Sequence, residues 1–424
     1  MHSGLSDQPK ALAIDVLRTD RAFELLAGEW DDLLASSDQR AYFLRWHWTK
    51  LWWSHFAPPR SRLHIITCRE PNGMLVGLAP LYWRQRRIVA VPFVRELALL
   101  GMGIELKTSE HVDVIARHGY ERRVAHGIAA VLHRSQDWDR LWLSQVPSQS
   151  QVLRHLQHAL GTRAQVTPCD RAPYIDTSVD WATFKQGFGR SMRRNVEYYP
   201  RRLFRLYPTA SFQHVTTAAD LDPAMDALVT LHRAWWRSRG EPGAFQASFE
   251  AFVREAARTS LELGQLRLWT LSIDGRIEAA LIGFLDNGRL HYFQKGINPS
   301  FAKDDLGTAL LALSIRDCFD DPGITAFDFM GGGAPYKDLW ARQSRENLQC
   351  EFRRPNWRTR TLEAGERIGR LAHRAFATFT PETLRAARRD LLKKRRIQKS
   401  IGLSSHLAIA AACRAACDSL VYMF

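Results

Sequence analysis

The sequence predicts an α/β fold built from mixed sheets and arranged as two consecutive units. One order of elements, a β-hairpin followed by a helix and a strand, occurs in each half of the chain. Apolar residues make up 46% of the 424 residues, which is enough for the cores of two or three domains. We therefore expect a disordered start at 1–10, one domain over 11–165, a second over 166–355 and a basic helical tail over 356–424.

The first unit begins with an aromatic-rich region over 22–56 that has helical spacing. Residues 63–83 then contain LHIITC, a turn with EPNG, and MLVGLAPLYW. Two β-rich runs separated by a glycine turn indicate a hairpin. Apolar residues recur at helical spacing over 120–135, and residues 138–147 have the composition of a strand.

The second unit repeats this order with stronger turn signals. Asp274-Gly275 and Asn287-Gly288 are dipeptides typical of tight hairpin turns. The elements that we predict around them are strands over 266–273, 277–286 and 289–297, a helix over 308–319 and a strand over 325–330. Because every α/β protein alternates helices and strands, a single arrangement without a repeat remains the alternative.

A basic stretch, FGRSMRRNVEYYPRRLFRL, lies between the two units at 188–206. Its composition indicates a helix, and a proline inside a helix removes a backbone donor, so we expect the helix to break at Pro200. Two further helices are predicted over 221–262. The loop RGEPGAFQ would lie between them.

The loop NPSFAKDDLG connects the predicted strand 289–297 to the helix that begins near Thr308. Gly307 allows close approach of the backbone, and the first turn of a helix leaves N–H groups unpaired. Such a helix end favours a phosphate or a carboxylate, so we predict a seat for the pyrophosphate of a nucleotide-like co-substrate. Asp304 and Asp305 would repel this group, and we expect Asp305 to cap the helix instead.

The segment FDFMGGGAPYKDLW (327–340) begins like a strand and then breaks into Gly331-Gly332-Gly333. Glycines leave room for a substrate against the backbone and can expose N–H donors. Asp328 could accept a proton from an attacking amine or hydroxyl, Tyr336 could return one to the leaving group, and Lys337 could hold negative charge. The alternatives are a carboxylate paired with an arginine, a core tyrosine and a surface lysine.

Other chemistry finds less support in the sequence. There is no GxxxxGK[ST] phosphate loop and no GxSxG elbow. His111-Val-Asp113 resembles half of a metal site, but the histidines are dispersed and no further ligands stand near it, so we expect no metal. The six cysteines form no CxxC pair, and no signal peptide or long apolar span is visible, which favours a soluble cytoplasmic protein.

Most of the net charge of +15 lies near the C-terminus, where residues 353–400 carry 15 Lys/Arg against 4 Asp/Glu. A basic segment of this kind could bind nucleic acid or the anionic inner face of a membrane. A solvated helix face explains the same composition. A peripheral position at the inner face of the membrane is therefore one reading of the tail.

Five stretches in one order resemble a known family. These stretches are FKQGFGRSMRRNVEYYPRRL (184–203), LHRAWWRSRG (231–240), LRLWTLSIDGRIEAALIGF (266–284), LHYFQKGINPSFAKDDLGTALL (290–311) and FDFMGGGAPYKDLW (327–340). Together they resemble the acetyltransferase-like domain of the GNAT superfamily that occurs in bacterial cellulose and exopolysaccharide biosynthesis proteins. That domain is related to the Fem-type aminoacyl transferases that build peptidoglycan cross-bridges.

The resemblance implies tandem GNAT-like domains and direct transfer of an acyl group from acyl-CoA, with acetyl-CoA as the first choice, to an amine or hydroxyl. The implied acceptor is a small-molecule or lipid-linked saccharide of the cell envelope or of an exopolysaccharide. The implied donor-binding residues are Gln294, Lys295, Gly296, Leu306, Gly307 and Thr308. The implied acceptor-binding residues are Arg193, Arg194, Asn195, Trp235, Gly331, Gly332 and Gly333, beside the catalytic Asp328, Tyr336 and Lys337.

One difference from the sequence pattern of the superfamily means that donors other than acyl-CoA remain possible. Its phosphate loop is typically a glutamine or arginine followed by spaced glycines, whereas this chain has Lys303-Asp304-Asp305-Leu306-Gly307. An aminoacyl-tRNA donor, gripped by residues 193–195 and the tail, is one alternative. A non-catalytic accessory protein of polysaccharide biosynthesis is another.

Overall fold

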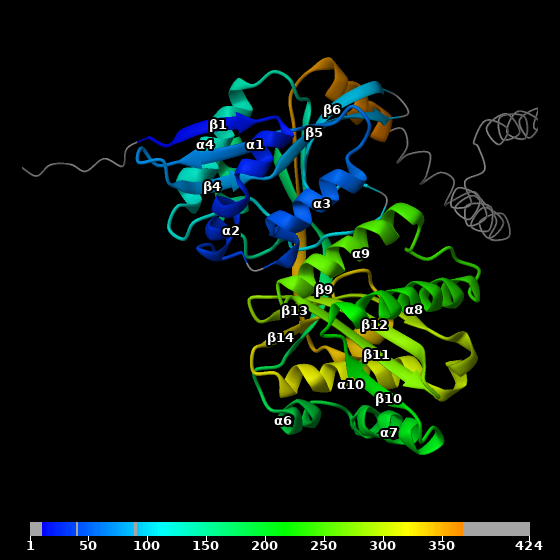
Figure 1. Ribbon diagram of the computed structural model, residues 1–424. Helices are drawn as coiled ribbons and strands as arrows, with labels where there is room; N and C mark the ends of the chain where they lie inside the picture. The colour runs from blue at the N-terminus through cyan, green and yellow to red at the C-terminus, as the bar shows by residue number, and fades with distance from the viewer. Residues whose placement is uncertain (1–10, 40, 89–90, 105, 368–424) are drawn as a thin grey trace, which may run out of the picture.

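The computed structural model describes residues 11–39, 41–88, 91–104 and 106–367 (Figure 1). The predicted disordered start and the part of the basic tail beyond residue 367 lie outside these ranges. Residues 357–367 are helical. Within the described ranges, none of the helices combines the length and the hydropathy that a membrane span requires.

The N-terminal half contains the helices and strands predicted for it, with additional short strands. Its elements are β1 (Ala13–Leu17), α1 (Asp20–Leu25), α2 (Ala27–Ala35), the 3₁₀ helix η1 (Tyr42–Leu44), α3 (Trp46–Phe56), β2 (Arg62–Leu63), β3 (Ile65–Arg69), β4 (Leu75–Ala79), β5 (Leu81–Ile88), β6 (Val91–Leu99), β7 (Ile115–Ala116), α4 (Glu121–Arg134), β8 (Arg140–Pro147) and α5 (Gln151–Leu160). The predicted hairpin strand 74–83 is two strands, since Pro80 separates β4 from β5.

The C-terminal half follows the predicted order closely. Its elements are β9 (Ala164–Asp176), α6 (Trp181–Gln186), α7 (Arg190–Leu206), β10 (Ser211–His214), α8 (Ala218–Arg237), α9 (Ala247–Glu262), β11 (Leu266–Ile273), β12 (Arg276–Asp286), β13 (Arg289–Ile297), the 3₁₀ helix η2 (Pro299–Asp304), α10 (Leu306–Asp320), β14 (Ala326–Asp328), α11 (Pro335–Trp340) and β15 (Gln343–Arg353). The predicted break at Pro200 is wrong, because α7 runs through it. Val196 and Leu203, on either side, are buried in the core beneath α7, which holds the helix together.

The strands form two sheets. A four-stranded sheet has the order β1-β3-β4-β7, and an eleven-stranded sheet has the order β10-β11-β12-β13-β14-β9-β15-β8-β6-β5-β2. The second sheet is mixed, since β13 pairs with β14 and β6 pairs with β8 in parallel, whereas their other neighbours are antiparallel. The mixed α/β class predicted from the sequence is therefore confirmed.

The two halves repeat one unit. In each half a parallel strand pair is joined by a crossover helix: β6, α4 and β8 in the first, and β13, α10 and β14 in the second. Each parallel pair is matched over three residues only. The strand that follows each of these units in the chain then pairs with the other unit: β9 comes after β8 and pairs with β14, and β15 comes after β14 and pairs with β8. The large sheet thus continues through both units, while the residue boundaries of the two domains stay a prediction.

The C-terminal part of the large sheet is buried on both faces. Along β12, Ala280 and Ile282 belong to one core cluster, while Ala279 and Leu281 belong to the other, as the alternation of a strand requires. Helices α8 and α9 lie on the first face, and α10 and α7 lie on the second (Figure 1). The first face shares its core with the N-terminal half, where Tyr42 stacks on Phe284 at 4.7 Å between ring centroids.

Candidate active site

A cavity of about 370 Å³ opens where strands β13 and β14 separate. The two strands pair only from Arg289–Ala326 to His291–Asp328, after which β14 ends and β13 continues. The space beside the rest of β13 is closed by the start of α10, by α7 and by α11. The residues that line it are Met192, Asn195, Val196, Tyr199, Trp235, Lys295, Ile297, Phe301, Ala302, Asp305, Leu306, Gly307, Thr308, Leu311, Tyr336, Leu339 and Trp340.

The start of α10 forms one wall of this cavity. Among the described residues, the backbone N–H groups of Leu306 and Gly307 have no hydrogen-bond partner, while Thr308 N–H bonds back to the carbonyl of Asp305 at 2.8 Å. A Cβ atom on Gly307 would lie 2.3 Å from Cδ1 of Ile297, so the glycine lets α10 approach β13. Unpaired N–H groups at a helix start attract anions, as the sequence suggested for this loop.

The two aspartates before α10 behave differently from each other. Asp304 turns away from the cavity, because its carboxylate accepts hydrogen bonds from Arg202 at 3.2 Å and from Tyr207 at 2.9 Å. Asp305 occupies the N-cap position with a left-handed φ of 55°, but the predicted cap is wrong, because its side chain makes no capping hydrogen bond. Its side chain lines the cavity instead. The N–H groups of the first turn are consequently left for another acceptor.

Lys295 and Tyr336 face each other across the cavity. The Lys295 ammonium lies 4.5 Å from the centroid of the Tyr336 ring, and no carboxylate among the described residues pairs with it. Burial, together with the charges of Lys337 and Arg239, lowers the pKa of Lys295 to about 8. The Tyr336 hydroxyl donates to the hydroxyl of Tyr292 at 3.2 Å, and burial raises the pKa of Tyr336 above its ordinary value. The cavity thus holds an unpaired cation and a protonated phenol.

Two of the predicted donor-binding residues lie next to the cavity and not in its wall. A Cβ atom on Gly296 would lie 2.5 Å from the carbonyl oxygen of Leu228, so this glycine admits the backbone of α8. His232 on α8 contacts the carbonyl of Lys295 through Nδ1 at 2.9 Å. Gln294 is half-buried and does not line the cavity either. Gly296 therefore lets β13 pack against α8, next to Lys295.

The three glycines after β14 are engaged by other parts of the protein. Gly331 N–H donates to Glu110 at 2.7 Å, and a Cβ atom at Gly331 would collide with the carboxylate of Asp170. Gly332 and Gly333 have φ values of 98° and 62°, which favour glycine. None of the three lines the cavity. These glycines allow the chain to turn and leave room for the nearby carboxylates. An acceptor-binding role for them stays a prediction.

Lys337 is buried behind the same turn. Its ammonium donates to the carbonyls of Phe329 at 2.8 Å and Met330 at 3.0 Å, and to that of Gly331. Burial lowers its pKa. The side chain is buried, in contrast to the surface position considered as the alternative, and it holds the strand end together. It does not line the cavity.

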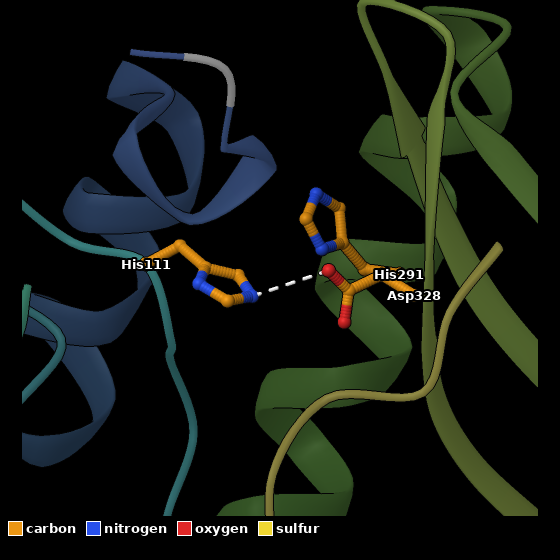
Figure 2. Close-up of side chains that lie close together, drawn as sticks. All are labelled: His111, His291 and Asp328. Carbon is orange, nitrogen blue, oxygen red and sulfur yellow. Dashed lines mark ion pairs between the residues drawn. The ribbon is translucent and has the colours of Figure 1, made fainter. Parts of the chain in front are cut away.

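Asp328 is fully buried at the last residue pair of β13 and β14. Arg345 donates to its Oδ2 at 3.0 Å, and Nε2 of His111 lies 3.3 Å from the same oxygen. Burial alone would raise the pKa of Asp328, but the charges of His111, His291 and Arg345 hold it well below its usual range. Figure 2 shows that His111 reaches Asp328 from one side while His291 stands next to it. The structure therefore favours the arginine-paired alternative for Asp328, away from the cavity.

Arginines of α7 line a second hollow, of about 480 Å³, on the outer surface of the helix. Its lining consists of Arg193, Arg194, Glu197, Tyr198, Arg201, Arg202 and Arg205. Arg193 is anchored by donating to the carbonyl of Gln186 at 2.8 Å, whereas Arg194 is exposed. Asn195 of the same helix faces the first cavity. The predicted run 193–195 is thus divided between two neighbouring surfaces.

Sequence reasoning located seven of the cavity residues: Asn195, Trp235, Lys295, Leu306, Gly307, Thr308 and Tyr336. It missed the aromatic and apolar wall, including Tyr199, Phe301 and Trp340. The spacing of Met192, Asn195, Val196 and Tyr199 along one face of α7 is the signal that could have indicated this wall. Trp340 has no comparable signal, because α11 is a single short helix after a turn.

Comparisons with known proteins agree with this geometry. Residues 190–338 match the family model described as an acetyltransferase (GNAT) domain. The structure is similar to the crystal structure of FemX, with 9% identity, a TM-score of 0.54, and coverage of 77% of this chain and 96% of that one. It is also similar to a conserved protein of unknown function from Bacteroides thetaiotaomicron, with 12% identity, a TM-score of 0.50, and coverage of 80% and 100%. No curated protein matches the chain in sequence.

These findings establish the class of chemistry. The match over 190–338 includes α7, β13, α10, β14 and most of α11, which together enclose the cavity. The chain is a transferase with a GNAT-type acyltransferase domain. The likenesses to solved structures concern the fold, and the substrate has to be argued from the cavity itself.

Proposed function

We propose that the protein transfers an acyl group from acyl-CoA, with acetyl-CoA as the first choice, to an amine or hydroxyl of a cell-envelope or exopolysaccharide precursor. One observation carries the proposal. The free N–H groups of Leu306 and Gly307 and the unpaired ammonium of Lys295 open into the same cavity. These are the groups that an anionic, phosphate-bearing donor requires.

The donor would lie along the start of α10. Its pyrophosphate would accept hydrogen bonds from the N–H groups of Leu306 and Gly307, with Thr308 as a further donor. The gap between β13 and β14 would take the part of the donor that carries the acyl group. The Asp304 carboxylate, paired with Arg202 and Tyr207, does not oppose this placement, and the ammonium of Lys295 would offset the charge of Asp305, which lines the same cavity.

Tyr336 would supply the proton for the thiolate that leaves the donor, and the proton that the attacking amine or hydroxyl releases would pass to solvent, from which the phenol is restored. A thiol has an ordinary pKa of about 8.5, so a phenol whose pKa is raised remains protonated at neutral pH and is a feasible donor. Lys295, 4.5 Å from the same ring, would stabilise the negative charge that develops on the carbonyl oxygen. Asn195 and Trp235 would contact the acceptor from the opposite wall.

The acceptor would be a small-molecule or lipid-linked saccharide. The cavity wall is largely apolar and includes five aromatic residues, and such faces suit both sugars and lipid-linked carriers. The basic segment over 353–400 would then keep the protein at the anionic inner face of the membrane, at roughly 1 kcal/mol per nearby Lys or Arg. Most of that segment lies outside the described residues, so this part rests on the sequence.

Calorimetric titration of the full chain with acetyl-CoA, a longer acyl-CoA and CoA tests the proposal. We expect one binding site that accepts all three, and a Leu306→Pro variant to bind more weakly because it lacks the N–H of the first helical position. A Leu306→Ala variant is the matched control, since it keeps the N–H group. If none of the acyl-CoA compounds binds the wild-type chain, acyl-CoA is excluded as the donor.

The arginine-lined hollow of α7 favours a second candidate, an aminoacyl-tRNA donor. Neutralising phosphates with arginines makes binding steeply dependent on salt. Binding of charged tRNA that weakens with salt, and that Arg194→Gln with Arg201→Gln reduces, would support this donor. If neither acyl-CoA nor charged tRNA raises the melting temperature, the non-catalytic accessory protein is the remaining reading.

A further inference from the structure

Three residues from distant parts of the chain meet where β13 and β14 separate. His291 and Asp328 are the last pair of the two strands, and His111 reaches them from the N-terminal half (Figure 2). One nitrogen or oxygen atom of each residue lies within 4.8 Å of one from each of the others. All three residues are 1% exposed or less. The acyl-transfer cavity does not include them.

The protonation of His111 is defined by its neighbours. Nδ2 of Asn347 donates to Oε1 of Gln145 at 3.0 Å, so Oδ1 of Asn347 is the acceptor that lies 2.9 Å from Nδ1 of His111. In a neutral His111 the proton is therefore on Nδ1, and the lone pair of Nε2 faces Oδ2 of Asp328 at 3.3 Å. Two acceptors at this distance repel each other unless a cation lies between them.

The second observation is the environment of His291. It is fully buried, and neither ring nitrogen has a hydrogen-bond partner among the described residues. A buried polar atom without a partner destabilises the fold, because it has lost its hydrogen bonds to water. A second proton on His111 would allow Nε2 to donate to Asp328, but it would leave the ring nitrogens of His291 without a partner. An ion at the centre would engage all three residues.

We propose that His111, His291 and Asp328 bind a divalent transition-metal ion, with zinc as the best representative. Imidazole nitrogen and carboxylate oxygen are common zinc ligands, and tetrahedral bonds of about 2.0–2.2 Å place ligand atoms about 3.4 Å apart. The separation of 3.3 Å between His111 and Asp328 is close to that spacing. Asn347 fills the outer role that orients a metal-bound histidine.

The charge of Arg345 is compatible with such an ion. Arg345 donates to Oδ2 of Asp328 at 3.0 Å, and the N–H of Met330 donates to Oδ1 at 2.8 Å. A carboxylate offers about four lone-pair sites, so one remains on each oxygen for the metal, and binding through both oxygens would complete four ligand atoms with the two imidazole nitrogens. The ion would fasten the N-terminal half to the point where the two strands part. Because solvent does not reach the cluster, its role is structural and does not depend on the proposed acyl transfer.

Calorimetric titration with zinc sulfate tests this site on the full chain after treatment with a chelator. We expect one zinc ion per chain and a thermal unfolding midpoint that rises when zinc is returned. His291→Phe, which keeps an aromatic ring in the core, should abolish both effects.

The chain offers two matched controls that should keep both effects. His64→Phe removes another fully buried imidazole whose ring nitrogens lack partners. His118→Asn alters the exposed group of Asp38, His118 and Glu121, where surface binding of zinc would occur. No zinc uptake by the wild-type chain, or uptake that survives His291→Phe and disappears in His118→Asn, would overturn the proposal. If His291→Phe fails to fold, cobalt added to the stripped wild-type chain decides: visible absorption of a four-coordinate imidazole-bound ion supports the site, and its absence overturns it.

Discussion

The part of β13 that extends past its pairing with β14 is open to the cavity, whereas the turn that follows β14 is closed. At the open end, the N–H groups of Leu306 and Gly307 have no hydrogen-bond partner among the described residues, and the ammonium of Lys295 contacts the ring of Tyr336 but no carboxylate. Beyond β14, the corresponding groups are paired, because Gly331 N–H donates to Glu110 and Lys337 donates to three carbonyls. The comparison teaches that unpaired polar groups, and not the number of glycines, indicate where a ligand binds.

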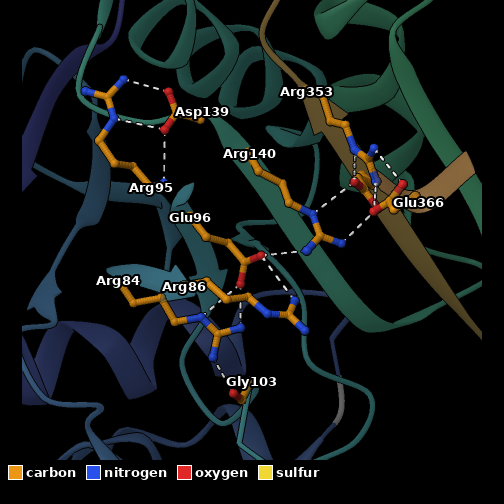
Figure 3. A network of polar contacts seen from close by, with 10 residues as sticks. Arg84, Arg86, Arg95, Glu96, Gly103, Asp139, Arg140, Arg353 and Glu366 are labelled. Atoms are coloured by element: carbon orange, nitrogen blue, oxygen red, sulfur yellow. Dashed lines mark hydrogen bonds and ion pairs between the residues drawn. The ribbon is translucent and has the colours of Figure 1, made fainter. Parts of the chain in front are cut away.

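Buried charges elsewhere in the protein reinforce this conclusion. Figure 3 shows Glu96, which is fully buried, between Arg84 and Arg140, with donor distances of 2.9 Å and 2.7 Å. A buried charge without a partner is costly, so proteins normally satisfy it in this way. Lys295 has no such partner, and its lowered pKa expresses the same cost. A ligand with negative charge would supply the missing partner.

The largest expected effect concerns the closed end. Lys337→Met should lower the free energy of unfolding by about 3 kcal/mol, because it leaves three carbonyls of the strand end without their charged donor. The matched variant Lys295→Met should leave stability unchanged or slightly increased, since it removes a cation that the fold does not pair. Urea unfolding of both variants measures the difference. If the two variants lose the same free energy of unfolding, the two lysines are equally well paired in the fold and the contrast between the two ends is wrong.

Tyr336 is the next test, because it belongs to α11 but faces the open end. Tyr336→Phe should reduce the rate of acyl transfer about 100-fold if the phenol donates a proton to the leaving group. Tyr292→Phe is the control, since it removes the neighbouring hydroxyl and leaves the donor in place. Circular dichroism should show both variants folded. An unchanged transfer rate in Tyr336→Phe would exclude this residue from proton transfer.

Local patterns predicted the open end well. The strand 289–297 coincides with β13, and the glycine before the predicted helix lies in the cavity wall. These features depend on turn dipeptides, periodicity and helix ends, which are local properties of the chain. The sequence did not reveal why Gly331 is a glycine. That reason is the carboxylate of Asp170, which arrives from a strand that the prediction missed.

The histidine cluster could not be predicted for the same reason. His111 stood in the sequence as half of a metal site, and the other two residues belong to strands of the other half. The loop of His111 reaches β13 and β14 through tertiary contacts, since His111 bonds to Asn347 of β15 and Glu110 accepts from Gly331. Contacts of this kind depend on tertiary structure, and a single sequence gives no signal for them.

A substitution at Gly307 sharpens the comparison at the helix start. Gly307→Asp should weaken binding of acyl-CoA more than tenfold, about 1.4 kcal/mol, because a carboxylate there repels the pyrophosphate at the helix start. Gly307→Ala is the control for size, since any Cβ atom at this position must displace Cδ1 of Ile297. Calorimetry separates the two effects. If alanine weakens binding as much as aspartate, the close approach of α10 and β13 matters and the charge does not.

The smallest expected effect is a pH dependence that originates in Lys295. Its pKa is about 8 in the folded protein, below its ordinary value of 10.5, so the side chain loses its charge as the pH rises through 8. Affinity for acyl-CoA should then fall severalfold between pH 7 and about 9. Stability should change in the opposite direction, because between pH 8 and 10.5 the unfolded chain binds more protons than the folded one and unfolding becomes less favourable. Lys295→Arg, which stays charged, should bind acyl-CoA without this fall in affinity. A wild-type affinity that is flat over this range would mean that the donor does not contact Lys295, and the open end would then hold its ligand through the helix start alone.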